Sequence, residues 1–143
     1  MKAALASIAI LLSLTGCVGT IEQKVQPVAL SGNEPREICL IENAAVHHEF
    51  LASYKKALSK RNLAVRLLPP GTALGGCPLM TTYDAKWTWD LALYLYYANL
   101  KVYHNNRLEG EALYDAAKGG TKTEKFINAE TKIQELTDQL FPG

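Results

Sequence analysis

The stretch that decides the fold runs from residue 83 to residue 103 and reads YDAKWTWDLALYLYYANLKVY. It holds both tryptophans and five of the seven tyrosines of the chain. Apolar and polar side chains alternate from Thr82 to Asp90, which is the pattern of a half-buried strand. One strand over residues 82–104 would span roughly 75 Å at about 3.3 Å per residue, so the stretch must break. We expect the break at Asp90, as a tight turn or a bulge.

The rest of this stretch, residues 91–103, keeps a period of two, and only its second half is clearly amphipathic. Its aromatic residues favour a strand over a helix. The face expected to meet the core carries Tyr94, Tyr96, Leu100 and Val102, joined by Tyr114 of the next strand. The opposite face is expected to carry Leu91, Leu93, Leu95 and Tyr97. Residues 104–107, HNNR, predict a hairpin turn because Asn tolerates positive φ, and a returning strand follows at 108–116.

The rest of the chain supplies two helices and two more strands. The apolar run ICLI at residues 38–41 is typical of a strand buried on both faces. Asn43 can cap the helix that follows, and a strand is expected at 63–68. A C-terminal helix is expected with Thr123 as its N-cap. Its buried stripe would consist of Phe126, Ile127, Ala129, Ile133, Leu136 and Leu140.

In chain order these elements are one strand, one helix, four strands and one helix. The first strand–helix–strand unit can place its two strands parallel in one sheet through a right-handed crossover. The antiparallel hairpin then extends that sheet. The expected fold class is α+β, a two-layer sandwich in which a mixed sheet of about five strands carries two helices on one face.

The first residues have the pattern of an export signal. Lys2 precedes an apolar run at residues 3–12, which is too short to span a bilayer, since a spanning helix takes about 20 residues. The tetrad LTGC at residues 14–17 resembles the lipobox of bacterial lipoproteins. The resemblance implies cleavage before Cys17 and lipidation of Cys17. The alternative is an ordinary secretory signal with an incidental cysteine.

The same resemblance implies a location. In bacterial lipoproteins an Asp after the acylated cysteine commonly retains the protein in the inner membrane, and this chain has Val18 there. We therefore expect the protein at the bacterial outer membrane, anchored by its acyl chains with its body in the periplasm. The expected division is a signal peptide at residues 1–16, a lipidated N-terminus and flexible tether at 17–35, and a single periplasmic domain at 36–143.

Cys39 and Cys77 are the two cysteines that remain. In an oxidising compartment a disulfide between them is the expected outcome. A redox or nucleophilic role is the alternative. The chain has no C-x-x-C motif, and neither cysteine has a histidine beside it in sequence. These observations favour a structural disulfide.

Charge and motif content argue against several classes of function. The chain has 15 Lys and Arg against 14 Asp and Glu, so we expect no nucleic-acid partner. His47 and His48 are adjacent on a helix and point in different directions, which indicates surface residues rather than a metal site. No G-x-G-x-x-G, G-x-S-x-G or H-E-x-x-H pattern occurs. We expect no cofactor, metal or catalytic residue, and an enzyme of unknown reaction remains an alternative.

The face of the sheet opposite the helices is the candidate functional surface. If both helices cover one face only, the set Leu91, Leu93, Leu95 and Tyr97 forms an exposed apolar patch of the kind that marks an interaction site. The alternative is that the tether or the loop at residues 69–79 packs over it. The patch is expected to meet an envelope protein or a second copy of the chain.

Three further segments carry a resemblance: AKWTWDLALYL at 85–95, GEALYDAAKGG at 110–120 and KFINAETKIQELTDQLFP at 125–142. Together they resemble a family of small proteobacterial outer-membrane lipoproteins. The strand order is also similar to that of the TolB N-terminal domain and of accessory lipoproteins that work by binding, a likeness of fold only. The expected function is a non-enzymatic interaction or accessory module of the cell envelope. The alternative is a small-molecule or lipid carrier that uses the Tyr/Trp face.

Overall fold

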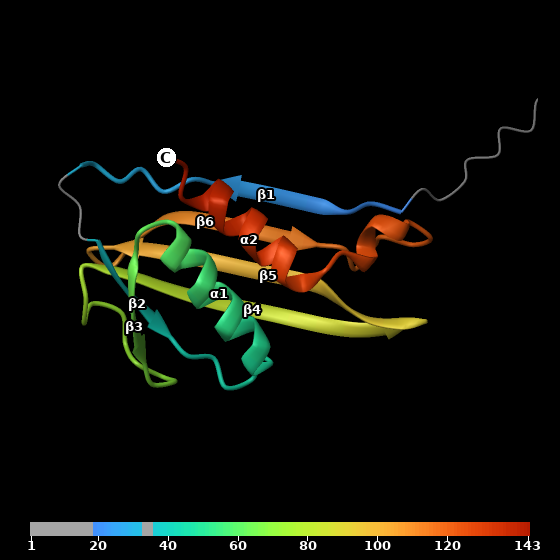
Figure 1. Cartoon of the computed structure of the whole chain (residues 1–143), viewed down its shortest axis with the longest axis horizontal. Helices are drawn as coiled ribbons and strands as arrows, with labels where there is room; N and C mark the ends of the chain where they lie inside the picture. Colours follow the sequence, from blue (N-terminus) through green and yellow to red (C-terminus); the bar gives the residue numbers. More distant parts are fainter. Residues whose placement is uncertain (1–18, 33–35) are drawn as a thin grey trace, which may run out of the picture.

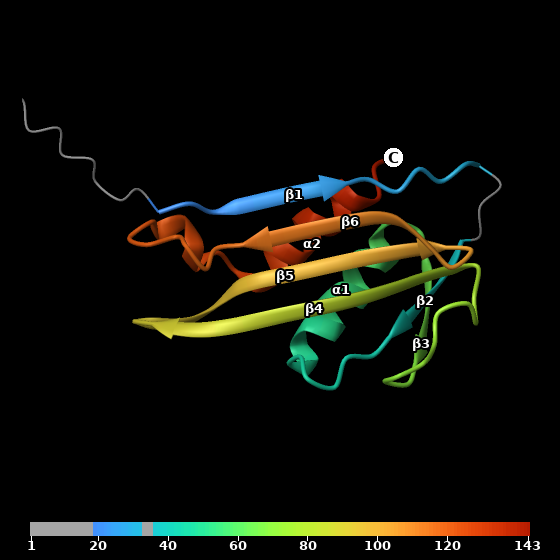
Figure 2. The same cartoon turned by 180° about the vertical axis from the view of Figure 1, so that it is seen from behind.

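The computed structural model describes residues 19–32 and 36–143, which form a six-stranded mixed sheet with two helices on one face (Figures 1 and 2). The expected α+β class is confirmed. The strands are β1 (Glu22–Gln26), β2 (Glu37–Ile41), β3 (Ala64–Leu68), β4 (Leu79–Asp90), β5 (Ala92–His104) and β6 (Arg107–Asp115). The helices are α1 (His48–Lys60), the 3-10 helix η1 (Thr123–Phe126) and α2 (Ala129–Leu140).

The strands lie in the order β1-β6-β5-β4-β2-β3. β2 is parallel to both β3 and β4, and the other neighbours are antiparallel. The helix α1 connects β2 to β3, as the predicted crossover requires. The predicted break lies where we expected it, because β4 ends at Asp90 and β5 begins at Ala92. Asn105 and Asn106 both have positive φ, 47° and 68°, which confirms the second hairpin turn.

The strand β1 corrects the expected tether at residues 17–35. Glu22–Gln26 pairs with β6 at the edge of the sheet, and the N–H of Val28 donates to the carbonyl of Leu140 at 2.8 Å. The domain therefore begins before residue 36. The sequence shows no hydrophobic alternation for this strand because the strand packs through polar groups. The Gln23 amide donates to Glu135 at 2.8 Å and accepts from the Lys132 ammonium at 2.9 Å.

Both predicted helix starts were wrong. The Asn43 side chain accepts from the N–H of Ala45 in a local turn, and α1 begins only at His48 without a side-chain cap. The second helix is capped by Asn128, whose Oδ1 accepts from the N–H of Thr131 at 3.0 Å. Thr123 instead begins η1, whose Phe126 is 38% exposed rather than buried. The extended backbone at residues 127 and 128 separates the two helices, which explains the displaced start.

The core lies between the helices and the sheet. Leu100, Val102 and Tyr114 are buried there as predicted, whereas Tyr94 and Tyr96, expected on the same face, are only half-buried. From the helical side the core receives Phe50, Tyr54, Leu58, Ile133, Leu136 and Leu140. The one buried polar contact from α1 to the sheet joins the hydroxyls of Tyr54 and Thr81 at 2.7 Å, among the described hydrogen bonds. Burial raises the pKa of the Tyr54 phenol well above its ordinary value.

Candidate interaction surface

A β-bulge divides the four residues that were expected to share the open face of the sheet. Lys86 of β4 pairs with Tyr97, but the next residue, Trp87, pairs with Leu95, so Tyr96 is an extra residue on β5. An extra residue reverses which side chains face the helices on either side of it. Leu95 is consequently fully buried in the core, although it was expected on the opposite face.

The other three residues expected on the open face, Leu91, Leu93 and Tyr97, also lie in different places. Leu93 shares the helical face with Leu95, since it lies two residues away on the same strand. Leu91 occupies the turn between β4 and β5. Tyr97 stays on the far face, where the Nζ atom of Lys86 lies 5.2 Å from its ring centre. The predicted continuous patch of four residues is therefore wrong.

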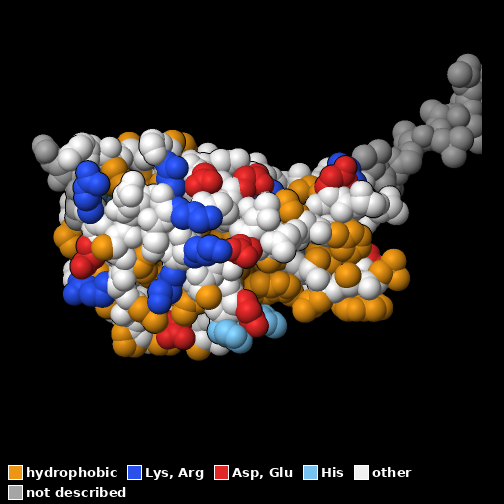
Figure 3. Space-filling view, in the orientation of Figure 1, with side chains coloured by type: hydrophobic (Ala, Val, Ile, Leu, Met, Phe, Trp, Pro, Cys, Tyr) orange, Lys and Arg blue, Asp and Glu red, His pale blue; other side chains and the backbone are white. Residues whose placement is uncertain are grey.

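The exposed apolar surface lies instead at the end of the β4–β5 hairpin. Trp89, Leu91 and Leu93, here called the hairpin tip, are 70%, 86% and 63% exposed. Figure 3 shows apolar side chains gathered at this end of the helical face, beyond the helices. The backbone of Leu91 has φ of 62°, a region that L side chains with a branched γ-carbon rarely adopt. Such a residue at a tight turn is a signal of a functional constraint.

The two tryptophans, only two positions apart, have different surroundings. The Trp87 ring lies 4.8 Å from the His47 ring and 6.0 Å from the Phe50 ring, measured between centroids. It lines a groove of about 360 Å³ between the first turns of α1 and α2, at whose rim Leu93 lies. Trp89 makes no such ring contact among the described residues and faces solvent. The sequence alone could not separate these two roles.

A buried lysine holds the base of the hairpin tip. The Lys125 ammonium donates to the Asp90 carboxylate and to the Gly120 carbonyl, each at 2.6 Å. The same ammonium lies 5.6 Å from the ring centre of Tyr94, which packs against Phe126. The hydrogen bond with Asp90 raises the pKa of Lys125, so the contact favours the charged form of the lysine. Sequence reasoning placed Asp90 only as a turn residue and missed this contact across 35 positions.

The face of the sheet away from the helices is uncovered along its middle strands (Figure 2). This open sheet face is defined by Lys86, Tyr97, Asn99, Lys101, Glu111 and Leu113, all exposed or half-buried. Glu111 accepts from the Asn99 amide at 2.9 Å and lies 3.9 Å from the Lys101 ammonium. The surface is thus a mixture of aromatic, charged and amide groups rather than the predicted leucine patch.

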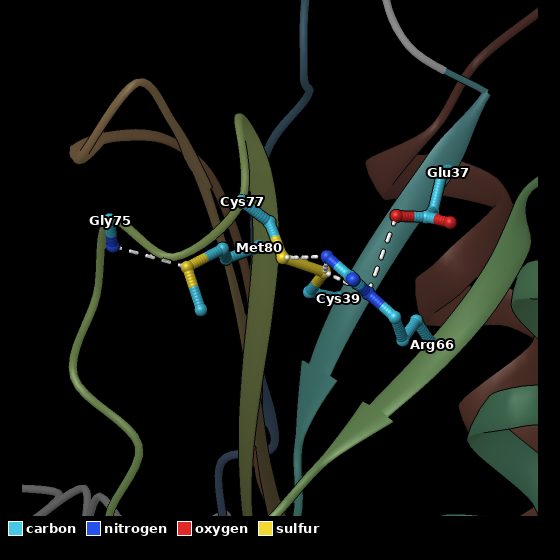
Figure 4. Close-up of a disulfide and its surroundings, with 6 residues drawn as sticks. All are labelled: Glu37, Cys39, Arg66, Gly75, Cys77 and Met80. Carbon is cyan, nitrogen blue, oxygen red and sulfur yellow. Dashed lines mark hydrogen bonds and ion pairs between the residues drawn. A yellow bond between two sulfur atoms is a disulfide. The ribbon is translucent and has the colours of Figure 1, made fainter.

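The predicted disulfide between Cys39 and Cys77 is present, with Cα atoms 6.3 Å apart (Figure 4). It joins β2 to the loop before β4. The Arg66 guanidinium lies against both sulfurs, with Nη2 at 3.2 Å from the Cys39 Sγ and 2.8 Å from the Cys77 Sγ. The Met80 thioether accepts from the N–H of Gly75 at 3.2 Å. These contacts hold the loop before β4 at the end of the sheet opposite the hairpin tip.

The histidines were expected to be surface residues. His47 and His48 are both exposed, and the His47 ring rests on Trp87. Within residues 19–32 and 36–143 no three His, Cys, Asp or Glu side chains are grouped so that they could hold a metal ion. The predicted lipidation residue, Cys17, and the signal peptide lie outside the described residues. Of the helices in the described part of the chain, none is long and apolar enough to cross a membrane.

Comparison with known proteins gives a likeness of fold. No protein-family model matches the chain, and no curated protein sequence matches it either. Among solved structures, the PelC dodecamer from Paraburkholderia phytofirmans is similar with a TM-score of 0.55 at 12% identity, covering 86% of this chain and 99% of that one. A dodecameric single-substitution variant of the same PelC gives a TM-score of 0.54 at 11% identity, covering 87% and 99%. At these identities the likeness concerns the fold alone.

Proposed function

We propose that this protein is a lipid-anchored envelope protein that acts by binding rather than by catalysis, and that it assembles with copies of itself. In this proposal Cys17 carries the lipid, the outer membrane holds the protein, and the described domain lies in the periplasm. The domain then serves as an accessory module of an envelope complex.

The observation that carries the proposal is the open sheet face. A six-stranded sheet with helices on one side leaves its other side available, and this side displays Tyr97 beside the charged pair of Lys101 and Glu111. Interfaces between soluble partners have this composition, with tyrosine enriched and polar groups satisfied at the rim. The likeness to PelC supports self-association, because both similar structures are dodecamers.

The lipobox-like tetrad at residues 14–17 supports the anchor. A single acyl chain gives only marginal membrane binding, whereas the several chains of a bacterial lipoprotein hold a protein stably. An anchored protein is confined to the membrane plane, so copies meet at high local concentration. Self-association on the membrane therefore needs only modest affinity between domains.

The test is the oligomeric state of the full chain after expression with its signal sequence. We would purify the acylated protein, measure its mass by native mass spectrometry, and crosslink it in intact cells. The open-face substitution Lys101→Glu is compared with Lys55→Glu, which makes the same charge reversal on the exposed side of α1. We expect multimers that Lys101→Glu weakens by about 10-fold or more in dissociation constant and Lys55→Glu leaves intact.

A monomer that retains its acyl chains and captures no envelope protein would overturn the interaction function. A multimer that both variants preserve equally would remove the open sheet face from the assembly. The Cys17→Ala variant serves as the unanchored control, since it keeps the domain and removes only the lipid.

A carrier is the second candidate, and one observation favours it. An open groove of about 560 Å³ lies between the segment after β1 and the C-terminal residues, lined by Val28, Leu63 and Phe141 and by the polar side chain of Arg61. A groove of this size suits a small amphipathic molecule. Mass spectrometry of gently purified protein tests this candidate, because a carrier should retain one stoichiometric small molecule or lipid.

A further inference from the structure

The hairpin tip is an apolar surface that no element of the described chain covers. Trp89, Leu91 and Leu93 lie next to one another at the end of two strands that extend beyond β6, α1 and α2 (Figures 1 and 3). The position of Leu91 would favour Gly or Asn, because its φ is 62°. A leucine at such a position, with 86% of its surface exposed, makes its apolar side chain a candidate for a contact outside the domain.

The described chain begins at the same end of the molecule. The backbone N–H of Thr20 donates to the Lys118 carbonyl at 2.7 Å, and Gly19 lies so close to Gly119 that a Cβ atom there would come within 2.3 Å of the Gly119 oxygen. Figures 1 and 2 show that the start of β1, the segment after β6 and the end of the β4–β5 hairpin lie at the same end of the molecule.

A continuous series of contacts connects the start of the described chain to the hairpin tip. Gly120 follows Gly119, and its carbonyl accepts from the Lys125 ammonium, which also binds the Asp90 carboxylate next to Leu91. Cys17 precedes Gly19 by only two residues, a reach of at most about 7 Å. An acyl anchor on Cys17 would therefore bring the hairpin tip to the membrane surface.

We infer that the hairpin tip is a second membrane contact, in which Leu91 and Leu93 enter the acyl region and Trp89 lies at the interface. This inference rests on the proposed function, because the anchor sets the orientation. Tryptophan is enriched at the membrane–water interface, and leucine partitions below it. The acyl chains alone hold the protein on the membrane stably, and a second contact would in addition fix its orientation.

The charges at this end are compatible with a lipid surface. Asp90, the acidic residue inside the turn, is paired with Lys125 and so does not enter the interface as a bare carboxylate. Lys118 and Lys122 lie in the adjoining segment, which also carries the exposed Glu124, and the two lysines would face anionic headgroups. A second protein copy is the other possible occupant. The membrane is favoured because the anchor lies two residues from this end and would face the tip toward the bilayer.

The experiment uses each tryptophan as a reporter. Full-chain acylated protein is reconstituted into vesicles of phosphatidylethanolamine and phosphatidylglycerol, with or without bromine atoms on the acyl chains, which quench tryptophan on contact. Trp87→Phe leaves Trp89 as the sole tryptophan, and Trp89→Phe leaves Trp87 as the matched control. Thermal unfolding confirms that both variants fold, and mass spectrometry of the N-terminal peptide establishes acylation of Cys17.

We expect brominated lipid to reduce the emission of Trp89 by about two-fold or more and that of Trp87 by little, since only Trp89 would reach the interface. Introducing Leu91→Gln and Leu93→Gln together should remove most of this quenching while Cys17 remains acylated.

Three results would overturn the inference, and they differ in what they leave standing. If the protein is acylated but Trp89 is quenched by aqueous acrylamide and not by brominated lipid, the tip does not contact the membrane. The proposed function would remain intact. Protection of Trp89 from both quenchers would assign the tip to a second protein copy. An unacylated Cys17 would overturn the proposed function and the orientation argument with it.

Discussion

The two halves of the β4–β5 hairpin have similar sequences and opposite surroundings. In the proximal half, residues 79–86 and 97–104 have β2 and β6 as neighbours and the helices above them. In the distal half, residues 87–90 and 92–95 have only each other as strand partners; Leu95 and Trp87 at its base still pack against the core, and most of the residues beyond them are exposed. Leu100 is fully buried and Leu91 is 86% exposed, although both stand in the same alternating run. Strand pattern therefore predicts pairing, while neighbouring elements decide what becomes core.

The largest change should follow removal of the disulfide, which ties the proximal end. The Cys39→Ala, Cys77→Ala double variant is expected to lose up to about 4 kcal/mol of unfolding free energy in urea, because a 38-residue separation no longer restrains the unfolded chain. The exposure of Trp89 to acrylamide should not change. Reduced wild-type protein is the control, and a reduced protein as stable as the oxidised one would contradict the prediction.

A matched pair of leucine substitutions tests the comparison within one strand. Leu100→Ala should lower the unfolding free energy by about 3 kcal/mol, since it leaves a cavity in the core, whereas Leu93→Ala should change it by less than about 0.5 kcal/mol. Chemical denaturation of both variants measures the difference. Equal losses would mean that Leu93 is packed as well, for example within an oligomer.

The proximal half should also show an alkaline pH dependence through Tyr54 of α1, whose hydroxyl contacts Thr81 of β4. Burial raises the pKa of Tyr54, so above about pH 10 the unfolded chain releases this proton while the folded chain keeps it. The associated stability is complete below pH 10 and declines as the pH rises further. Tyr54→Phe should make this decline shallower and cost about 1 kcal/mol at pH 7 through the lost hydrogen bond to Thr81.

Tyr83 and Tyr114 also have raised pKa values, caused first by burial, so part of the alkaline decline should persist in the Tyr54→Phe variant. Leu93→Ala is the control, with an unfolding profile against pH parallel to that of the wild type. A Tyr54→Phe profile identical to that of the wild type would contradict the prediction.

The smallest effect is expected at the turn. Leu91→Asn should raise the unfolding free energy by about 0.5 kcal/mol, because Asn tolerates positive φ better than Leu does. The same change should weaken the contact of the hairpin tip with vesicles. Ala92→Asn, one residue along, is the control and should bring no gain. A loss of stability in Leu91→Asn would show that the leucine is already packed.

The sequence carried more information about the bulge than alternation alone revealed. Apolar residues occupy odd positions at Leu91, Leu93 and Leu95, and even positions at Ala98, Leu100 and Val102. A switch of parity within one strand requires an extra residue, and the doubled tyrosine at 96 and 97 marks its place. The error in the predicted patch came from reading one parity through the whole strand.

Other features had no local signal. Gln23 and Lys132 meet across 109 positions, and Lys125 meets Asp90 across 35. These polar side chains resemble any solvated lysine or glutamine in the sequence, because their partners lie on distant elements. The edge strand β1 and the paired base of the hairpin tip could therefore not be found from the sequence.

The sequence by itself determined the fold class, the two hairpin turns and the pairing of Cys39 with Cys77. These features depend on periodicity, on backbone preferences of single residues and on a count of cysteines, all of which are local. Only the tertiary structure decided which apolar residues of the hairpin are core and which are surface. Burial depends on the elements that pack beside a strand, and those neighbours come from parts of the chain far away in sequence.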